Sequence, residues 1–176
     1  MLMLECFYPD LYMSSTYRID FGRYYEKGYR GVIFDIDNTL VPHGAPADER
    51  SVTLIESLKE MGFGVVFLSN NKEPRVKLFN DAVKARYIFK AGKPARKGYL
   101  RAMEMLGTDP GTTLFVGDQL FTDVWGARNT GIFSILVRPI DKKEEIQIVL
   151  KRYLEKVVLA FYRRRCRKEG KIYCCQ

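Results

Sequence analysis

Apolar residues in this chain fall into short unbroken runs that alternate with longer stretches of helical periodicity. The runs are rich in β-branched and aromatic residues and most end in a polar residue, as buried parallel strands do. We expect strands in five segments, the third being the weakest: 30–37, 62–71, 85–91, 109–119 and 130–137. Helices are expected between or after them, at 48–62, 73–85, 95–107 and 120–131. Strands alternating with helices predict a parallel α/β sheet with right-handed crossovers.

The segments outside this alternation extend the core at both ends. Residues 1–30 form a Tyr-rich lead that we expect to pack on the core, which spans residues 31–141. Residues 142–176 are expected to form an amphipathic helix and tail, because apolar positions recur there at helical spacing. The 176-residue chain is therefore organised as one folded unit with an appendage.

The net charge of +8 belongs to the tail. Residues 142–171 hold 11 Lys and Arg against 4 Asp and Glu, which leaves 18 against 17 in residues 1–141. The tail helix is expected either to pack on the domain or to lie at an anionic membrane surface. Its basic cluster at 163–168 suits lipid headgroups or RNA. No aromatic-rich RNA-binding motif accompanies the cluster, so nucleic acid is the less favoured partner.

Cysteine usage and hydropathy indicate an intracellular protein. The four cysteines lie near the two ends without the spacing of a disulfide framework or a zinc site, so we expect reduced thiols. The N-terminus lacks the basic region of a signal peptide, and no apolar run approaches the roughly 20 residues of a membrane span. These features predict a cytoplasmic protein that contacts the inner face of the membrane, if at all, as a peripheral one.

Polar side chains follow the apolar runs at the carboxyl ends of the predicted strands. In parallel α/β sheets the ligand sits in the crevice beyond these ends. The side chains expected to meet there are Asp35, Asp37, Ser69, Asn70, Lys93 and Asp118. The sequence therefore predicts one polar site at one edge of the sheet.

Two of these residues, Asp35 and Asp37, stand one residue apart in "FDIDNTL". Side chains alternate along a strand, so the two carboxylates are expected to point to the same side and to repel each other. A shared hard cation such as Mg2+ relieves this repulsion. Asp118 is a natural third ligand, and Asp123 is expected to support the metal or to orient Lys93.

Carboxylates beside a metal favour phosphoryl chemistry. Asp35 is a candidate nucleophile toward phosphorus, since a carboxylate can form an aspartyl-phosphate. Asp37 can act as general acid to the leaving oxygen and then as general base to water. Lys93 and Ser69 are the kinds of cation and hydrogen-bond donor that the transferring group requires.

Other interpretations of these residues are weaker. A calcium-binding EF-hand loop beginning at Asp35 fails, because Leu40 stands where Gly belongs and Pro46 where Glu belongs. His43, the only histidine, lies in a predicted loop and is more readily a bystander than a catalyst. Trp125 is expected in the core.

The motifs resemble, in order, the four motifs of the haloacid dehalogenase (HAD) superfamily of phosphohydrolases over roughly residues 30–137. "DIDNT" resembles the first, with Asp35 as nucleophile, Asp37 as acid/base and Thr39 near the phosphoryl group, although Thr39 could equally cap the turn. The motifs "LSNN", "GKP" and "GDQLFTD" match through Ser69, Lys93, Asp118 and Asp123. Of the two asparagines after Ser69, Asn70 is the better candidate for the site.

The resemblance implies a three-layer Rossmann-like fold with a five-stranded sheet of order 5-4-1-2-3 and a Mg2+-dependent phosphatase. The 28 residues between Leu40 and Ser69, and the 24 positions from Ser69 to Lys93, leave no room for a cap domain. Capless members (subfamily IIIA) often act on bulky substrates.

More narrowly, "PDLYMSSTYRID", "DNT" and the basic extension resemble the YqeG-type bacterial branch, which is similar to the mitochondrial phosphatase acting on phosphatidylglycerophosphate. This resemblance implies a phosphate on a lipid headgroup as the substrate. Two alternatives stay open. The substrate could be a soluble phosphometabolite or a phosphoprotein, or the chain could be an RNA- or ribosome-associated module whose basic tail binds while the core serves as scaffold.

Overall fold

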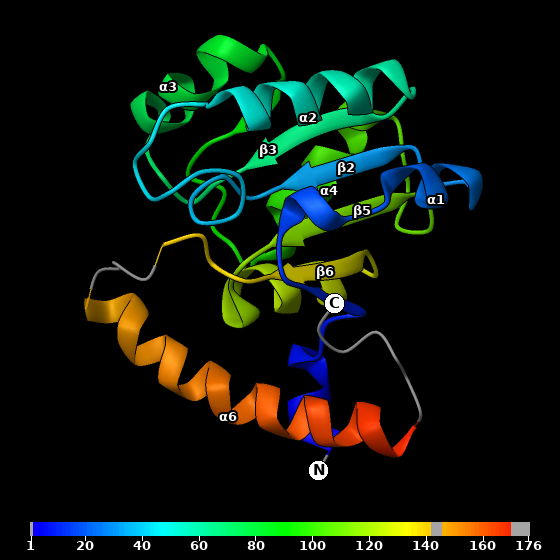
Figure 1. Cartoon of the computed structure of the whole chain (residues 1–176), viewed down its shortest axis with the longest axis vertical. Coiled ribbons are helices and arrows are strands. Elements are labelled where there is room, and N and C mark those ends of the chain that lie inside the picture. Colours follow the sequence, from blue (N-terminus) through cyan, green and yellow to red (C-terminus); the bar gives the residue numbers. More distant parts are fainter. Residues whose placement is uncertain (1, 142–145, 170–176) are drawn as a thin grey trace.

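A parallel sheet lies at the centre of the fold (Figure 1). The computed structural model describes residues 2–141 and 146–169, and within them six strands pair in the order β1-β6-β5-β2-β3-β4. All five pairings are parallel. The strands are β1 (Leu11–Met13), β2 (Gly31–Phe34), β3 (Gly64–Leu68), β4 (Arg86–Ile88), β5 (Thr113–Gly117) and β6 (Phe133–Val137).

The predicted fold class is confirmed, with one correction to the sheet. Strands β2 to β6 are the five expected strands, and they lie in the expected order. The N-terminal lead adds a sixth strand, β1, which pairs with β6 so that Leu11 lies opposite Ile135. The five-strand count was wrong because β1 has three residues, too few for a periodic pattern.

Helices cover both faces of the sheet. Along the chain they are the 3-10 helices η1 (Leu2–Phe7) and η2 (Thr16–Arg18), then α1 (Phe21–Glu26), α2 (Glu49–Glu60), α3 (Glu73–Val83), α4 (Arg96–Leu106), the π-helical turn η3 (Leu120–Val124), α5 (Trp125–Asn129) and α6 (Ile146–Lys168). Side chains of α1, α2 and α3 share a buried cluster with alternate residues of the strands. Those of α4 and α5 pack on the other face, around Ile33 and Phe115.

Local sequence explains where several helices begin and end. Asp48 caps α2, since its carboxylate accepts the Ser51 N–H at 2.8 Å while the Ser51 hydroxyl accepts the Asp48 N–H at 3.0 Å. Pro74 sits in the first turn of α3, where no N–H is needed. Gly107 ends α4 in a left-handed conformation, with φ of 67°.

The long helix α6 lies at the far end of the molecule beside the N-terminal segment (Figure 1). Its buried residues Val158 and Tyr162 share a third cluster with Tyr12, Leu136 and residues of η3. An ion pair between Arg165 and Glu5 joins it to η1. Helix α6 is thus folded against the core at its β1–β6 edge.

Two further features concern the expected compartment. Cys166 on α6 is disulfide-bonded, which contradicts the prediction of a reduced thiol there. Within residues 2–141 and 146–169, no helix combines the length and hydropathy that crossing a membrane requires.

Candidate active site

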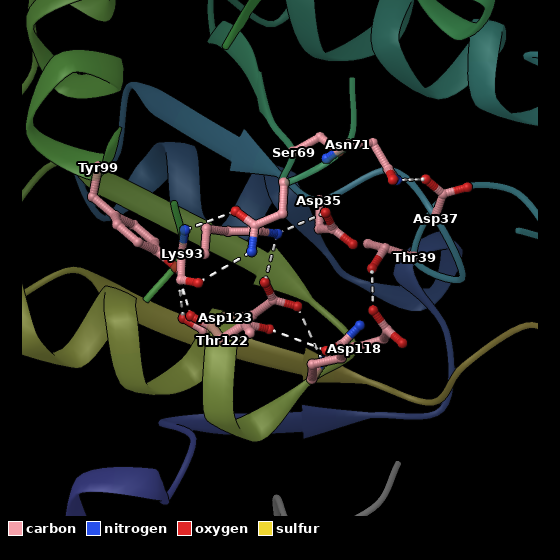
Figure 2. A network of polar contacts seen from close by, with 12 residues as sticks. Asp35, Asp37, Thr39, Ser69, Asn71, Lys93, Tyr99, Asp118, Thr122 and Asp123 are labelled. Carbon is pink, nitrogen blue, oxygen red and sulfur yellow. Dashed lines mark hydrogen bonds and ion pairs between the residues drawn. The ribbon is translucent and has the colours of Figure 1, made fainter. Parts of the chain in front are cut away.

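Three buried carboxylates gather at the carboxyl ends of two neighbouring strands (Figure 2). Asp35 follows β2 and Asp118 follows β5, and these strands are paired so that Phe34 lies opposite Val116. Asp123 comes from η3. One oxygen of each of the three acids lies within 4.8 Å of the others, and their residues are 6%, 2% and 0% exposed.

Lys93 lies between two of these acids. Its Nζ donates to Asp35 Oδ1 and to Asp123 Oδ1, both at 2.7 Å, and the residue is 8% exposed. The Asn70 side chain holds the backbone of Lys93: its Oδ1 accepts the Lys93 N–H at 2.7 Å, and its amide donates to the Lys93 carbonyl at 3.1 Å. Asn70 therefore supports the backbone of the lysine, and its predicted binding of phosphate stays a prediction.

Burial dominates the electrostatics of the cluster. It raises the pKa of Asp35 to about 7, against the Lys93 charge, which lowers it, and with Asp123 adding to the rise. Burial likewise raises the pKa of Asp118 well above its usual range, although the charge of Arg152 opposes the shift. For Lys93, burial lowers the pKa, but Asp123 and Asp35 outweigh it and the pKa is raised. The surroundings of Asp35 and Asp118 thus do not fully stabilise the charged form of these carboxylates. Carboxylate oxygens are the ligands that a hard divalent cation prefers, and such a cation would supply the missing positive charge.

Gly117 allows Asp123 to approach the strand end. A Cβ at Gly117 would stand 2.5 Å from Asp123 Oδ2, closer than any real contact. The same oxygen accepts the Gln119 N–H at 3.0 Å, so the carboxylate is packed against the chain that follows β5. The glycine of "GDQLFTD" is therefore a steric requirement of the acid cluster.

Two hydroxyls predicted to bind phosphate lie in the same region. The Thr39 hydroxyl donates to Asp118 Oδ1 at 3.2 Å, and the residue is buried. Ser69 is also buried, and its Oγ accepts the Asn71 N–H at 3.1 Å in the turn after β3. The structure brings both hydroxyls to the strand ends that hold the acids.

Asp37 lies outside the acid cluster, contrary to its prediction as a carboxylate ligand of the same metal. Its Oδ1 accepts from Arg75 Nε at 3.1 Å and Nη2 at 2.9 Å, and from the Gly44 N–H at 2.7 Å. Its Oδ2 accepts from the Asn71 amide at 2.7 Å (Figure 2). His43 Nδ1 stands 3.7 Å from Oδ1.

The reason for this departure is the path of the chain. β2 ends at Phe34, and Asn38 adopts a left-handed conformation with φ of 60°. The alternation of side chains that predicted a shared cation holds only inside a strand, and Asp37 lies beyond β2, in an isolated bridge to Val41. Its carboxylate is therefore directed to α3 and the following loop.

Three residues in contact with the acids were absent from the sequence-based prediction. Asn71, in the turn after β3, binds Asp37 where we had favoured Asn70. Arg75 stands in the first turn of α3, where a cation is unfavourable beside the helix dipole, and this conflict was a usable sign of an acidic partner. Arg152 had no such sign, because it lies 34 positions from its partner Asp118.

Arg152 connects the tail to the site. Its Nη1 donates to the Asp118 carbonyl at 2.6 Å and to Glu155 Oε2 at 2.9 Å, and its Nη2 forms an ion pair with the Asp118 carboxylate. Glu155 is itself buried and accepts the Leu120 N–H at 2.7 Å. Helix α6 therefore supports both Asp118 and the start of η3.

Trp125, which we expected in the core, lies at the start of α5. Its ring is half-buried and meets the ring of Phe7 at a centroid distance of 5.4 Å. This packing joins α5 to η1, on the side of the fold where the N-terminal segment lies.

Comparison with known proteins supplies relatives for this arrangement. A family model described as haloacid dehalogenase-like hydrolase matches residues 43–131. That range includes Ser69, Lys93, Asp118 and Asp123 and begins after Asp37. The chain is 33% identical over 165 residues to "Probable phosphatase YqeG" of Bacillus subtilis (strain 168), covering 93% of this chain and 96% of that protein.

A second relative is longer. Over 173 residues the chain is 30% identical to "Phosphatidylglycerophosphate phosphatase 1, chloroplastic/mitochondrial" of Arabidopsis thaliana, covering 91% of this chain and 48% of that protein. Among solved structures, the fold resembles the cobalt-bound deoxy-D-mannose-octulosonate 8-phosphate phosphatase of Haemophilus influenzae. The TM-score is 0.52 at 15% identity, over 63% of this chain and 69% of that one.

Proposed function

Because the chain belongs to the haloacid dehalogenase-like hydrolase family and is a phosphatase of that family, we propose that it hydrolyses a phosphomonoester through an aspartyl-phosphate on Asp35. The observation that carries this proposal is the gathering of Asp35, Asp118 and Asp123 around Lys93 at the strand ends. Three buried acids with one buried lysine suit a site that receives a phosphate together with a cation.

The covalent step uses Asp35 and Asp37. The Asp35 carboxylate attacks phosphorus, the bond from phosphorus to the ester oxygen breaks, and Asp37 gives that oxygen its proton. Water then attacks the phosphorus of the aspartyl-phosphate, losing its proton to Asp37, and the Asp35 carboxylate is released with inorganic phosphate. Lys93, Ser69 and Thr39 supply donors for the phosphoryl oxygens.

We propose Mg2+ as the cofactor. Asp35 and Asp118 would hold it, while Asp123 supports the site and keeps Lys93 in place. When bound, the cation neutralises carboxylate and phosphoryl charge. Asp37 has no place in this ligand set through its carboxylate, which is occupied by Arg75 and Asn71.

For the substrate we propose a phosphate on a lipid headgroup, with phosphatidylglycerophosphate the first to test. The support is the similarity to the Arabidopsis protein of that name, which extends over 91% of this chain. Soluble phosphometabolites and phosphoproteins are the competing substrates, and the RNA-associated module is the competing function.

The test is phosphate release from phosphatidylglycerophosphate in detergent micelles, beside a panel of soluble phosphomonoesters, with Mg2+ or with a chelator. We expect the lipid to give the highest kcat/KM and the chelator to abolish release. Asp35→Asn should be inactive, whereas Asp81→Asn, an exposed aspartate on α3, should match the wild type.

A higher kcat/KM for a soluble ester would contradict the proposed lipid substrate, but it would be consistent with the proposed mechanism. Equal inactivity of wild type and Asp35→Asn on every ester would contradict the enzyme itself. Tail-dependent RNA binding, weakening with salt, would then support the binding module.

A further inference from the structure

Within residues 152–168, helix α6 has a packed inward face and an exposed outward face. The inward face includes Glu155, Val158, Tyr162 and Cys166, each 6% exposed or less. On the outward face four large apolar side chains stand in solvent: Tyr153 at 61%, Leu154 at 58%, Val157 at 55% and Phe161 at 49%. We call these four the outer ridge. Three of them, at four-residue spacing, form one continuous row on the helix.

The row continues into basic residues. Arg164 and Lys168 follow Phe161 at helical spacing and are exposed, and Lys156 stands 4.8 Å from the centre of the Tyr153 ring. The only acidic residue in residues 152–168 is Glu155, which is buried and paired with Arg152. Within residues 152–168 the outward face is therefore apolar toward its start and positive toward its end, and the next carboxylate, Glu169, is paired with Arg165.

The ridge has a fixed orientation relative to the site. Val158 and Tyr162 anchor the opposite face of α6 in the core, so the exposed side chains of the ridge point outward. It begins at Tyr153, the residue directly after Arg152, and Arg152 binds Asp118 at the candidate site. The ridge thus lies on the outer side of the helix whose Arg152 reaches inward to Asp118.

We propose that the outer ridge, together with Lys156, Arg164 and Lys168, docks on the surface of an anionic lipid bilayer. The apolar side chains enter the boundary between headgroups and acyl chains, and the basic side chains meet the headgroup phosphates. This inference rests on the proposed lipid substrate and adds to it a contact that would hold the protein on the bilayer that contains this substrate.

The test is flotation of the full-length protein with vesicles of phosphatidylcholine containing phosphatidylglycerol, and with vesicles of phosphatidylcholine alone. We expect binding to the anionic vesicles only. Val157→Ser with Phe161→Ser should lower the partition by about tenfold or more. Arg164→Gln with Lys168→Gln should lower it by about fivefold for each charge removed.

The matched control is Leu78→Ser with Leu100→Ser, because these leucines on α3 and α4 are 48% and 47% exposed but lie away from α6. The control should bind vesicles as the wild type does. All variants should keep wild-type turnover of p-nitrophenyl phosphate, which requires no membrane.

Two results would overturn the docking proposal. One is equal vesicle binding by the ridge variant and the wild type. The other is light scattering that shows a dimer in the wild type and a monomer in the ridge variant, with neither bound to vesicles; the ridge would then be an interface between copies of this chain. Ridge-dependent binding by a protein inactive on all phosphoesters would retain the docking surface and contradict the proposed function.

Discussion

Asp35 and Asp37 stand two positions apart in the chain, yet they have opposite surroundings. Asp35 is enclosed with two other acids, and its pKa is raised to about 7, by burial first and with only partial relief from Lys93. Asp37 receives four hydrogen bonds, from the Gly44 N–H, the Asn71 amide and two nitrogens of Arg75. The first carboxylate lacks compensation for its charge, whereas the second is fully supplied with donors.

This difference separates two tasks that a phosphatase needs. A carboxylate in a charge-rich, buried cluster becomes stable as an anion once a cation joins it, which suits the residue that attacks phosphorus. A carboxylate held from several sides has a fixed direction, and we propose that Asp37 transfers the proton from that position. The separation arises beyond the end of β2 at Phe34, where the alternation of strand side chains no longer holds.

The largest expected effect comes from removing the proposed nucleophile, Asp35. Asp35→Asn should lower phosphate release by about 10⁴-fold or more, since no neighbouring carboxylate takes over the covalent step. Acid quenching during turnover of a radiolabelled substrate should show phosphate bound to the wild-type protein and none bound to the variant. Labelled protein in Asp35→Asn would contradict the assignment of the nucleophile.

Asp37→Asn should have a smaller effect that depends on the leaving group. For an alkyl phosphate we expect a loss of about 10²- to 10⁴-fold, because the alkoxide departs without a proton. For p-nitrophenyl phosphate, whose leaving group needs no proton, formation of the aspartyl-phosphate should change far less, as a pre-steady-state burst would show. Equal losses of the burst rate for both esters would place Asp37 outside proton transfer.

Arg75→Ala should test whether the direction of the Asp37 carboxylate matters. We expect kcat to fall by about tenfold through loss of a two-nitrogen contact to a charged group. Arg75→Lys should restore only part of it, because an ammonium cannot reproduce that geometry. Lys77→Ala is the control on the same helix, with 57% of its side chain exposed. Wild-type pre-steady-state kinetics in Arg75→Ala would show that Arg75 is only structural.

The smallest effect concerns stability without metal. Since the pKa of Asp35 is raised to about 7 in the fold, the folded state holds a proton that the unfolded state loses near pH 4. Its contribution to the free energy of unfolding is therefore present at acid pH and is lost as the pH rises through 7. In a chelator, Asp35→Asn should raise the Tm at pH 8 by at least roughly 2–4 °C.

Adding Mg2+ to the wild type at the same pH should also raise the Tm, and it should do so less in Asp35→Asn. A Tm of the metal-free wild type that rises steadily from pH 4 to pH 8 would show that burial does not dominate the charge of this cluster.

The sequence was sufficient to predict the features that depend on residues close together in the chain. Strands β2 to β6 and helices α2 to α4 follow from apolar periodicity and from caps such as Asp48 and Gly107. The meeting of Asp35 with Asp118 follows from parallel strand ends. These inferences need only the direction of a strand and the side on which it ends.

The rest depended on contacts between distant segments and on turns. Strand β1 exists because β6 offers an unpaired edge, which no pattern within residues 11–13 reveals. The choice of Asn71 over Asn70 as partner of Asp37 is decided by the turn after β3, where the two amides point to different neighbours. Arg152 could be placed only once α6 was seen against the core.

The pairing of Arg152 with Asp118 has a practical consequence for dissecting this protein. A polypeptide shortened at residue 141 would lose Arg152 and Glu155 together, and with them the partners of a buried carboxylate and of the Leu120 N–H. Any loss of activity in such a fragment would reflect the disturbed surroundings of Asp118 and Leu120, and it would not show the role of the missing tail. The inward face of α6 is part of the candidate site. The role of its outward face can therefore be tested only by substituting single exposed side chains in the full-length protein.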